Sequence, residues 1–262
     1  MNGAAFFDLD KTLMEGSSAI HFGRAAYKAG MVSRRQLVRD AWANIHFRLN
    51  GSTDEGTDAL RARVLESIAG VRQLDLARLA PEVLTGVLPL VYRDLLQVAW
   101  EHQDAGRQVY IVTAASQELA EMLAHVLVLD GGIGVRSEVE DGVYTGRPDG
   151  PFTYREGKAE AIRQKAGEEG IDLEASYAYS DSESDLPMLR LVGHPVAVNP
   201  DRELLRVARE EGWEILHLDK LGRRLRALAV VGAVALVGGG GGYVVARVRP
   251  SRRRTVGLPG IG

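Results

Sequence analysis

An apolar run near the N-terminus ends in two acids, and this feature constrains the fold more than any other. Residues 4–7 read Ala-Ala-Phe-Phe and lead directly into Asp8, with Asp10 two positions later. A short apolar run of this kind is typical of a strand buried on both faces in a parallel sheet. Because side chains two positions apart on a strand share a face, both carboxylates can reach one ligand beyond its end.

Further apolar strand patterns follow in the second half of the chain, and helical patterns separate them. The expected strands after the first are the runs at 109–113, 176–180, 195–198 and 214–218. The spacing of apolar residues predicts helices over 89–105, 117–127 and about 157–167. Asp141 and Gly142, set between alternating residues, predict a β-hairpin. Strands that alternate with helices predict a Rossmann-like α/β core, a parallel sheet with helices on both faces.

The stretch directly after the first strand has a helical pattern and shows no convincing alternation. Ser33 is suited to cap a helix whose apolar residues recur at helical spacing. We therefore expect a helical cap of residues 14–88, inserted into a catalytic core made of residues 1–13 and 89–220.

Charge is distributed unevenly along the 262 residues. The segment 221–262 holds eight arginines and no acid, which leaves 24 basic and 35 acidic residues in positions 1–220. An acidic body with a basic tail usually points to an acidic partner surface. The chain has no cysteine, which excludes a disulfide framework, thiolate catalysis and a cysteine-based zinc site.

The tail contains a candidate membrane segment, residues 227–246, with no charged side chain over a length sufficient to cross a bilayer core. Six glycines in this segment weaken a helix, since each costs about 1 kcal/mol relative to alanine. The alternative is a short buried helix followed by a flexible linker. We favour a hydrophobic tail helix that anchors the protein, with residues 227–254 in contact with lipid. No export signal precedes the first strand, so we expect a cytoplasmic catalytic domain.

Polar side chains follow three of the predicted strands, at the carboxyl ends where open α/β sheets bind ligands. They are Asp8 with Asp10, Thr113, and Asp181 with Asp185. A single acid at such a place more often caps or complements a helix. Four acids on one rim repel one another unless a cation lies among them, and oxygen ligands without histidine or cysteine favour Mg²⁺. Lys158, in a predicted helix, adds a fixed positive charge.

These residues carry a resemblance to a known family. The chain resembles the haloacid dehalogenase (HAD) superfamily of hydrolases, in particular its phosphoserine-phosphatase-like branch, subfamily IB. The four ordered motifs of this branch are matched by DLDKT at 8–12, VYIVT at 109–113, Lys158, and SDSESD at 180–185. The resemblance extends over roughly residues 4–218 and implies an α/β core with an inserted cap.

The resemblance also implies a role for each matched residue. Asp8 is expected to be the nucleophile that forms an aspartyl-phosphate, and Asp10 the general acid and base. Mg²⁺ is expected to be held by the Asp8 side chain, the Asp10 carbonyl, Asp181 and Asp185. The phosphoryl oxygens are expected to bind Thr113, the Ala114 amide and Lys158. Thr12 is expected to stabilise the loop after the nucleophile.

Some positions depart from the phosphoserine-phosphatase pattern. Those enzymes place a glutamate for the substrate's amino group where this chain has Ser17, and commonly an asparagine where it has Ser184. Their second motif usually reads Ser-Gly-Gly, where this chain has Thr113, Ala114 and Ala115. The amide donor at position 114 is kept, so we expect phosphate binding, but the motifs do not select the phosphate ester.

We therefore predict a Mg²⁺-dependent phosphatase that hydrolyses the phosphate monoester of a small metabolite or a lipid. Two alternatives are kept: a phosphotransferase in which another alcohol replaces water, and a non-catalytic binding module tethered to a membrane. The complete set of motif residues argues against the binding module, because a scaffold needs none of them. We expect a small phosphorylated substrate and no nucleic acid as partner.

Overall fold

The computed structural model describes residues 3–33, 61–62 and 64–218. They belong to the first of two compact units, Met1–Leu218 and Asp219–Gly262. The helix expected after Ser33 lies outside the described residues, and so does the basic tail with its candidate membrane segment at 227–246. Among the described helices, none combines the length and the apolar composition that crossing a membrane requires. Lipid contact through residues 227–254 therefore stays a prediction.

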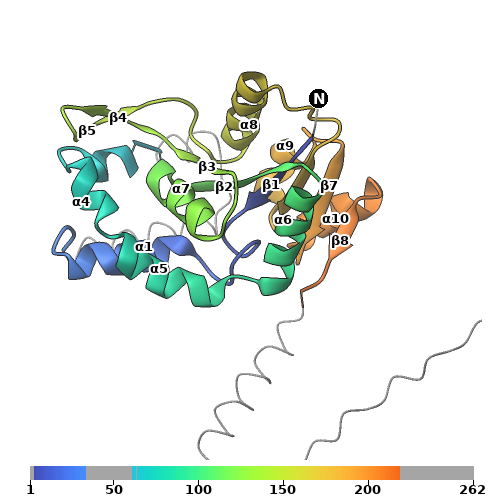
Figure 1. The fold of residues 1–262 in the computed structure, drawn as a ribbon, viewed down its shortest axis with the longest axis horizontal. Coiled ribbons are helices and arrows are strands. Elements are labelled where there is room, and N and C mark those ends of the chain that lie inside the picture. The colour runs from blue at the N-terminus through green and yellow to red at the C-terminus, as the bar shows by residue number, and fades with distance from the viewer. Residues whose placement is uncertain (1–2, 34–60, 63, 219–262) are drawn as a thin grey trace, which may run out of the picture. The chain divides into compact units, whose positions relative to one another are not determined.

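A parallel sheet of six strands forms the centre of the described unit (Figure 1). Its spatial order is β3-β2-β1-β6-β7-β8, and neighbouring strands pair in parallel throughout. The strands are β1 Ala4–Asp8, β2 Gln108–Ser116, β3 Gly131–Val135, β6 Tyr177–Ser180, β7 His194–Val198 and β8 Glu214–Leu216. The predicted α/β architecture with a parallel sheet is confirmed.

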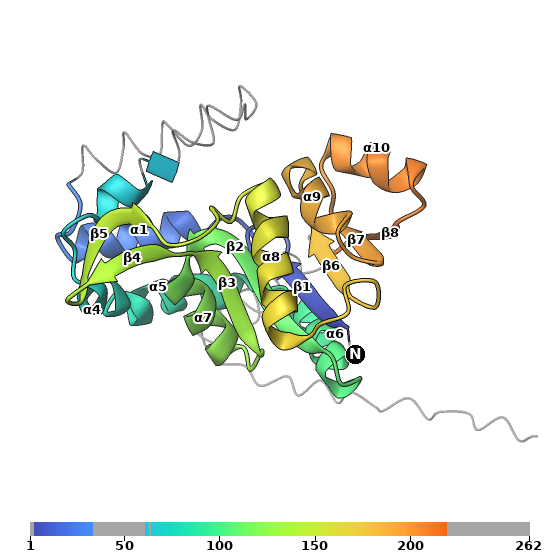
Figure 2. The ribbon, with the colours of Figure 1, turned by 90° about the horizontal axis from the view of Figure 1, so that it is seen from above.

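Helices cover both faces of this sheet (Figures 1 and 2). One face packs against α6 Arg93–Asp104 and α7 Gln117–Val126. The other face packs against α8 Glu156–Glu169, α9 Leu186–Leu189 and α10 Arg202–Glu210. Two hydrophobic cores result, one on each side of the sheet.

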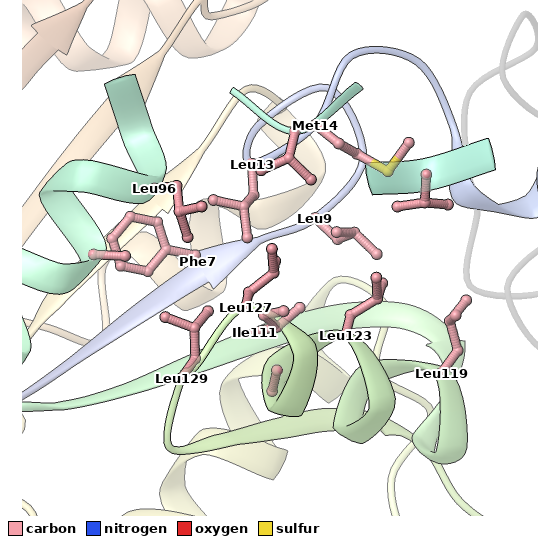
Figure 3. Packing of buried hydrophobic residues seen from close by; sticks show 14 of the residues in the cluster. Phe7, Leu9, Leu13, Met14, Leu96, Ile111, Leu119, Leu123, Leu127 and Leu129 are labelled. Carbon is pink, nitrogen blue, oxygen red and sulfur yellow. The ribbon is translucent and has the colours of Figure 1, made fainter. Parts of the chain in front are cut away.

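Strand β1 supplies both cores, because its alternate side chains point to opposite faces. Ala5 and Phe7 enter the core with α6 and α7, and Ala4 and Phe6 enter the core with α8, α9 and α10. Figure 3 shows Phe7 in one cluster with Leu96 of α6. All five residues of β1 are buried, which explains why its sequence is an unbroken apolar run up to the first acid.

The described part of the predicted cap is helical. It contains α1 Ser18–Lys28, α4 Gln73–Ala77 and α5 Ala80–Val87, followed by a 3₁₀ turn at Leu88–Leu90. The two segments that connect cap and core pair with each other through backbone hydrogen bonds. Glu15 N–H donates to Leu90 O over 2.9 Å, and Tyr92 N–H donates to Leu13 O over 2.9 Å. The division into core and cap as separate domains stays a prediction.

The predicted hairpin is confirmed as the antiparallel pair β4 Ser137–Glu140 and β5 Val143–Pro148. Its turn residues Asp141 and Gly142 have φ angles of 50° and 77°. Positive φ at both central residues is what a two-residue turn between twisted strands requires. The Asp-Gly pair therefore supplies the conformation that the turn needs.

The hairpin also pairs with the cap, a contact that the local sequence pattern does not predict. Gly70 N–H donates to Tyr144 O over 2.8 Å, and Tyr144 N–H donates to Val71 O over 2.9 Å. Gln73 N–H donates to Gly142 O over 2.9 Å. In Figures 1 and 2 the hairpin accordingly lies beside α4.

Strand β3 is missing from the sequence-based prediction, because three of its five residues are glycine. Glycine contributes no side chain to a strand pattern and weakens a strand by itself. The close packing of α7 and of the residue before it on β3 requires two of these glycines. A Cβ on Gly132 would lie 2.3 Å from the carbonyl carbon of Ala120, and a Cβ on Gly134 would lie 2.7 Å from Ser116 O.

Two predicted boundaries also differ from the structure. The helix expected over 89–105 begins at Arg93, because a 3₁₀ turn and the extended residue Val91 precede it. Strand β2 continues past Thr113 to Ser116, with a register shift against β3 after Val112. Thr113 therefore lies within its strand rather than at the strand's end.

The outer edge of β3 is occupied by the side chain of Gln117, the first residue of α7. Gln117 Nε2 donates to Gly132 O over 2.8 Å, and Gly134 N–H donates to Gln117 Oε1 over 2.7 Å. The other edge of β3 pairs with β2. The side-chain amide of Gln117 thus binds β3 as the backbone of a neighbouring strand would.

Replacing Gly132 by alanine tests the packing of α7 on β3. We expect Gly132→Ala to lower the free energy of unfolding by about 2 kcal/mol, because the added methyl group meets backbone that cannot retreat. Gly167→Ala in α8 is the matched control, since a Cβ there meets no neighbouring atom within 4 Å, and we expect it to stabilise by about 1 kcal/mol. Urea denaturation measures both. Equal effects of the two substitutions would contradict the close approach.

A buried histidine lies under the central strands. His102 of α6 is 7% exposed, and its Nε2 lies 2.7 Å from the Tyr179 hydroxyl. Nη1 of Arg107 lies 3.4 Å from its Nδ1. Burial, together with the positive charge of Arg107, lowers the pKa of His102 to about 4. The fold therefore holds the neutral imidazole.

This pKa makes stability depend on pH. The unfolded histidine has a pKa of about 6.5, so the unfolded state binds the proton more readily, and stability is lost as the pH falls through 6.5 toward 4. We expect His102 to account for a loss of about 2 kcal/mol between about pH 7.5 and pH 5. Urea unfolding of His102→Gln at the two pH values should show a correspondingly smaller loss than the wild type. An unchanged pH dependence would show that the imidazole is not held neutral.

Candidate active site

The carboxyl ends of β1, β2 and β6 meet at one edge of the sheet, because these strands are adjacent and parallel. Asp8 is the last residue of β1, and its partner on β2 is Val112, so Thr113 lies one residue beyond it. Asp181 directly follows β6. Three motif residues that are distant in the sequence therefore meet where open α/β sheets bind ligands.

Lys158 of α8 joins two of the predicted site acids. Its Nζ donates to Asp8 Oδ1 over 2.5 Å and to Asp185 Oδ2 over 2.7 Å. The side chains of Lys158, Asp8 and Asp185 are only 4%, 9% and 3% exposed. Ser180 Oγ adds a hydrogen bond to Asp185 Oδ2 over 2.6 Å. The ammonium group is thereby fixed between two buried carboxylates.

Lys158 reaches this position because α8 begins in close contact with the loop before it. A Cβ on Gly157 would lie 1.7 Å from Phe152 O, so only glycine fits there. Arg155, the N-cap of α8, has a φ angle of 52°, which is unfavourable for a residue other than glycine. The surrounding structure therefore holds this turn, and with it the first turn of the helix that carries the lysine.

Burial and neighbouring charges shift the pKa of Asp8 and the pKa of Lys158 from their ordinary values. Burial raises the pKa of Asp8 to about 8; Lys158 opposes this rise, whereas repulsion from Asp185 and Asp181 adds to it. Burial alone would lower the pKa of Lys158, but the carboxylates of Asp185 and Asp8 raise it above its ordinary value. The lysine is therefore charged, and a single ammonium group does not neutralise all the carboxylates around it.

Asp181 accepts hydrogen bonds from the loop that follows β1 and from the N-cap residue of α10. Thr12 Oγ1 donates to Asp181 Oδ1 over 3.2 Å, and Asp201 N–H donates to the Asp181 carbonyl oxygen over 2.8 Å. Burial raises the pKa of Asp181 to about 6, and the positive charge of Lys11 opposes the rise. Thr12 thus connects the first motif with the fourth.

Asp10 is bonded to the cap. Its Oδ2 accepts a hydrogen bond from Ser17 Oγ over 2.8 Å, and its Oδ1 accepts one from Ser18 N–H over 2.8 Å. Ser17 is the N-cap of α1, and Ser18 is the first residue of that helix. Asp10 therefore links the edge of the sheet with the first cap helix.

The second motif lies on β2 beside Asp8. Thr113 is buried, and its Oγ1 accepts a hydrogen bond from Ala115 N–H over 3.1 Å. Its carbonyl oxygen accepts from Thr153 Oγ1 over 2.8 Å. Ala114, which lies between Thr113 and Ala115 in the sequence, is exposed. These contacts fix the backbone of the segment that is expected to bind a phosphoryl group.

The structure thus brings most of the predicted site residues together, but one of them bonds to the cap instead. Repulsion from Asp185 and Asp181 helps to raise the pKa of Asp8, repulsion from Asp185 helps to raise the pKa of Asp181, and Lys158 bonds to both Asp8 and Asp185. Asp10 is bonded instead to α1. Within the described ranges, no three acidic or histidine side chains form a ready-made cage for a metal ion.

Three residues, Ser17, Ser180 and Asp201, make contacts with the predicted site that the sequence analysis does not predict. Ser180 opens the fourth motif, so its position beside Asp185 could be expected from that motif. Asp201 accepts from Glu183 N–H over 2.9 Å and caps α10. Neither Asp201 nor Ser17 carries a local signal for these contacts, because both depend on how distant segments pack.

Two cavities lie away from the acids. A groove of about 490 Å³ lies over β3 between α7 and α8. A largely apolar groove of about 180 Å³ lies between the cap helices and α7. Neither is lined by Asp8, Asp10 or Asp181. We therefore define the candidate active site by its side chains.

Comparison with known proteins identifies the family of this chain. The family model for haloacid dehalogenase-like hydrolases matches residues 5–190, which include all four motifs. The chain belongs to this family. Among solved structures, a protein of unknown function from Bordetella pertussis Tohama I has a TM-score of 0.73 and 27% sequence identity, over 82% of this chain and 98% of that one.

Relatives within the family carry the names of different phosphatases. Phosphoserine phosphatase SerB1 of Mycobacterium tuberculosis is 37% identical over 255 residues, 97% of this chain and 82% of that protein. A histidinol-phosphatase of Neisseria meningitidis is 32% identical over 222 residues, 83% of this chain and 99% of that protein. The predicted resemblance is confirmed, and so is the enzyme class: the chain is a phosphatase of this family.

Removing the buried ammonium group tests its structural role. We expect Lys158→Met, measured in EDTA near neutral pH, to lower the free energy of unfolding by about 3 kcal/mol, because two buried carboxylates lose their partner. Lys165→Met in the same helix is the control, since the Lys165–Glu169 pair is partly exposed and such pairs contribute about 1 kcal/mol or less. Urea denaturation compares the two. Similar losses would show that the buried cluster is no more important than a surface pair.

Proposed function

We propose that this phosphatase is a Mg²⁺-dependent phosphomonoesterase that forms an aspartyl-phosphate on Asp8. The observation that carries the proposal is the buried contact between Asp8 and Lys158 at the carboxyl edge of the sheet. A carboxylate held beside a fixed cation is suited to attack a phosphoryl group that the same cation binds. Membership in a hydrolase family supports hydrolysis as the outcome.

The chemistry of the acids fits a hard divalent cation. Carboxylate and carbonyl oxygens are the ligands that Mg²⁺ prefers. Burial raises the pKa of both Asp8 and Asp181, so a bound cation would favour their ionised forms. We assign Mg²⁺ to these two side chains and the Asp10 carbonyl. Asp185 has a supporting role, because it already bonds to Lys158. When bound, the metal would offset the negative charge of the phosphoryl group.

The remaining roles follow from the proposed nucleophile. A carboxylate oxygen of Asp8 bonds to phosphorus as the bond from phosphorus to the leaving oxygen breaks, and Asp10 gives its proton to that oxygen. Thr113, the Ala114 amide and Lys158 hold the phosphoryl oxygens. Water then attacks phosphorus and gives a proton to Asp10. The bond from phosphorus to the Asp8 oxygen breaks, which releases inorganic phosphate and restores the Asp8 carboxylate.

We propose small phosphate monoesters of primary alcohols as the substrate class. The named relatives support this class, because phosphoserine and histidinol phosphate are both such esters. Ser17, where the phosphoserine-phosphatase pattern has a glutamate for the amino group, bonds to Asp10 in this chain. A screen with phosphoserine, histidinol phosphate and lysophosphatidate, the last representing lipids, selects among members of the class by phosphate release.

Substitution of the proposed nucleophile tests the reaction. We expect the full chain to hydrolyse p-nitrophenyl phosphate with Mg²⁺, to stop in EDTA, and to recover when Mg²⁺ is restored. Asp8→Asn should lower the rate by about a thousandfold or more, because the amide cannot attack phosphorus. Asp94→Asn, at an exposed position of α6, is the matched control and should keep its activity.

The covalent intermediate has its own readout. Acid quenching during turnover should leave wild-type protein with the added mass of one phosphoryl group, which hydroxylamine removes, and Asp8→Asn should carry none. Activity that persists in Asp8→Asn would refute the nucleophile. Activity that is unaffected by EDTA would refute the metal.

A further inference from the structure

Ser17 makes an unusual contact for a residue at the start of a helix. A serine in this position typically accepts a hydrogen bond from an amide of its own first turn, but Ser17 makes no such bond. Its hydroxyl instead donates to Asp10 Oδ2 over 2.8 Å. The adjacent amide of Ser18, an N–H of the first turn of α1, donates to Asp10 Oδ1 over 2.8 Å. The carboxylate of Asp10 therefore accepts from the N-cap hydroxyl and from the first amide of the helix, whereas a capping side chain would accept from a later amide of that turn.

The two serines of this contact are buried, and Asp10 is partly buried. Ser17 is 8% exposed and Ser18 is 1% exposed, whereas the exposure of Asp10 is intermediate. A hydrogen bond from a buried donor to a carboxylate is stronger than one between neutral groups, so its loss costs more than that of an exposed neutral pair. The first turn of α1 contains no acidic residue of its own, so the negative charge at this helix terminus comes from Asp10.

Two donors on two different oxygens fix the plane of the Asp10 carboxylate. Each carboxylate oxygen can accept about two hydrogen bonds, and here each oxygen uses one of them for the cap. With respect to the described residues, the second position on each oxygen stays available for a proton or for water. The contact thus restrains the orientation of the group without consuming its capacity to give or take a proton.

We propose that Ser17 is a positioning residue that orients Asp10 as the general acid and base, and that it does not bind the substrate. The inference rests on the proposed function, in which Asp10 protonates the leaving oxygen. Removing the hydroxyl frees the carboxylate plane to turn about its Cβ–Cγ bond, because Ser18 alone holds only one oxygen. Proton transfer then becomes slower although the nucleophile and the phosphate contacts are unchanged.

The leaving group distinguishes this role from a merely structural one. A nitrophenolate leaves readily without a proton, whereas an unsubstituted phenolate, which is more basic, gains more from general acid catalysis. The two substrates, p-nitrophenyl phosphate and phenyl phosphate, are similar in shape. A defect in the orientation of Asp10 should therefore lower kcat/KM, which reports the transfer to Asp8, much more for phenyl phosphate than for the nitro compound.

The test compares three variants of the full chain in Mg²⁺. We expect Ser17→Ala to lower kcat/KM for phenyl phosphate by about tenfold or more and to affect p-nitrophenyl phosphate only slightly. Ser17→Thr, which keeps a hydroxyl, should recover most of the loss. Ser67→Ala is the control, because it removes an exposed hydroxyl of the cap that bonds to Val64 O, and it should behave as wild type on both substrates.

The outcomes distinguish a failure of this inference from a failure of the proposed function on which it rests. An equal fall on both substrates, or a rise in KM at unchanged kcat, would overturn the positioning role of Ser17 while leaving the phosphatase intact. A wild-type chain that hydrolyses neither ester would refute the proposed function and this inference together. Retention of the urea midpoint by Ser17→Ala, with the selective loss on phenyl phosphate, would support the inference.

Discussion

The buried ammonium group of Lys158 is the interaction on which the described structure depends. It bonds to Asp8 at the end of β1 and to Asp185 after β6, so one side chain from α8 joins the two central strands of the sheet. Without it, two carboxylates would face each other in a medium of low polarity, a costly arrangement. The same group lies where phosphate is expected to bind, so stability and chemistry share one cluster.

Three of the sets of hydrogen bonds described above connect the cap with the rest of the described unit. Its two connecting segments pair through backbone hydrogen bonds, and the hairpin β4–β5 pairs with residues 70–73. The third connection runs through side chains, from α1 to Asp10. Only this third connection reaches a group that is expected to act on the substrate. It therefore gives the position of a cap helix a direct effect on the chemistry at the edge of the sheet.

Much of the fold could be predicted from the sequence, because the apolar runs that form β1 and β2 are continuous and local. Asp8 at the end of β1 and Asp181 after β6 could also be predicted to converge, since parallel neighbours end at the same edge. Strand β3 could not be predicted, because contact with α7 selects glycine there. The pairing of Lys158 with Asp185 and of Ser17 with Asp10 depends on segments that meet only in the folded chain.

Among the described strands, β3 forms one edge of the sheet, and Gln117 bonds to the backbone along that edge. An unpaired strand edge exposes alternating donors and acceptors to which another chain can add, and natural proteins block such edges to avoid aggregation. Gln117 occupies one donor and one acceptor of that row, at Gly134 and Gly132. An incoming strand would have to displace this amide before it could align, so growth of the sheet by copies of the protein is hindered on this side.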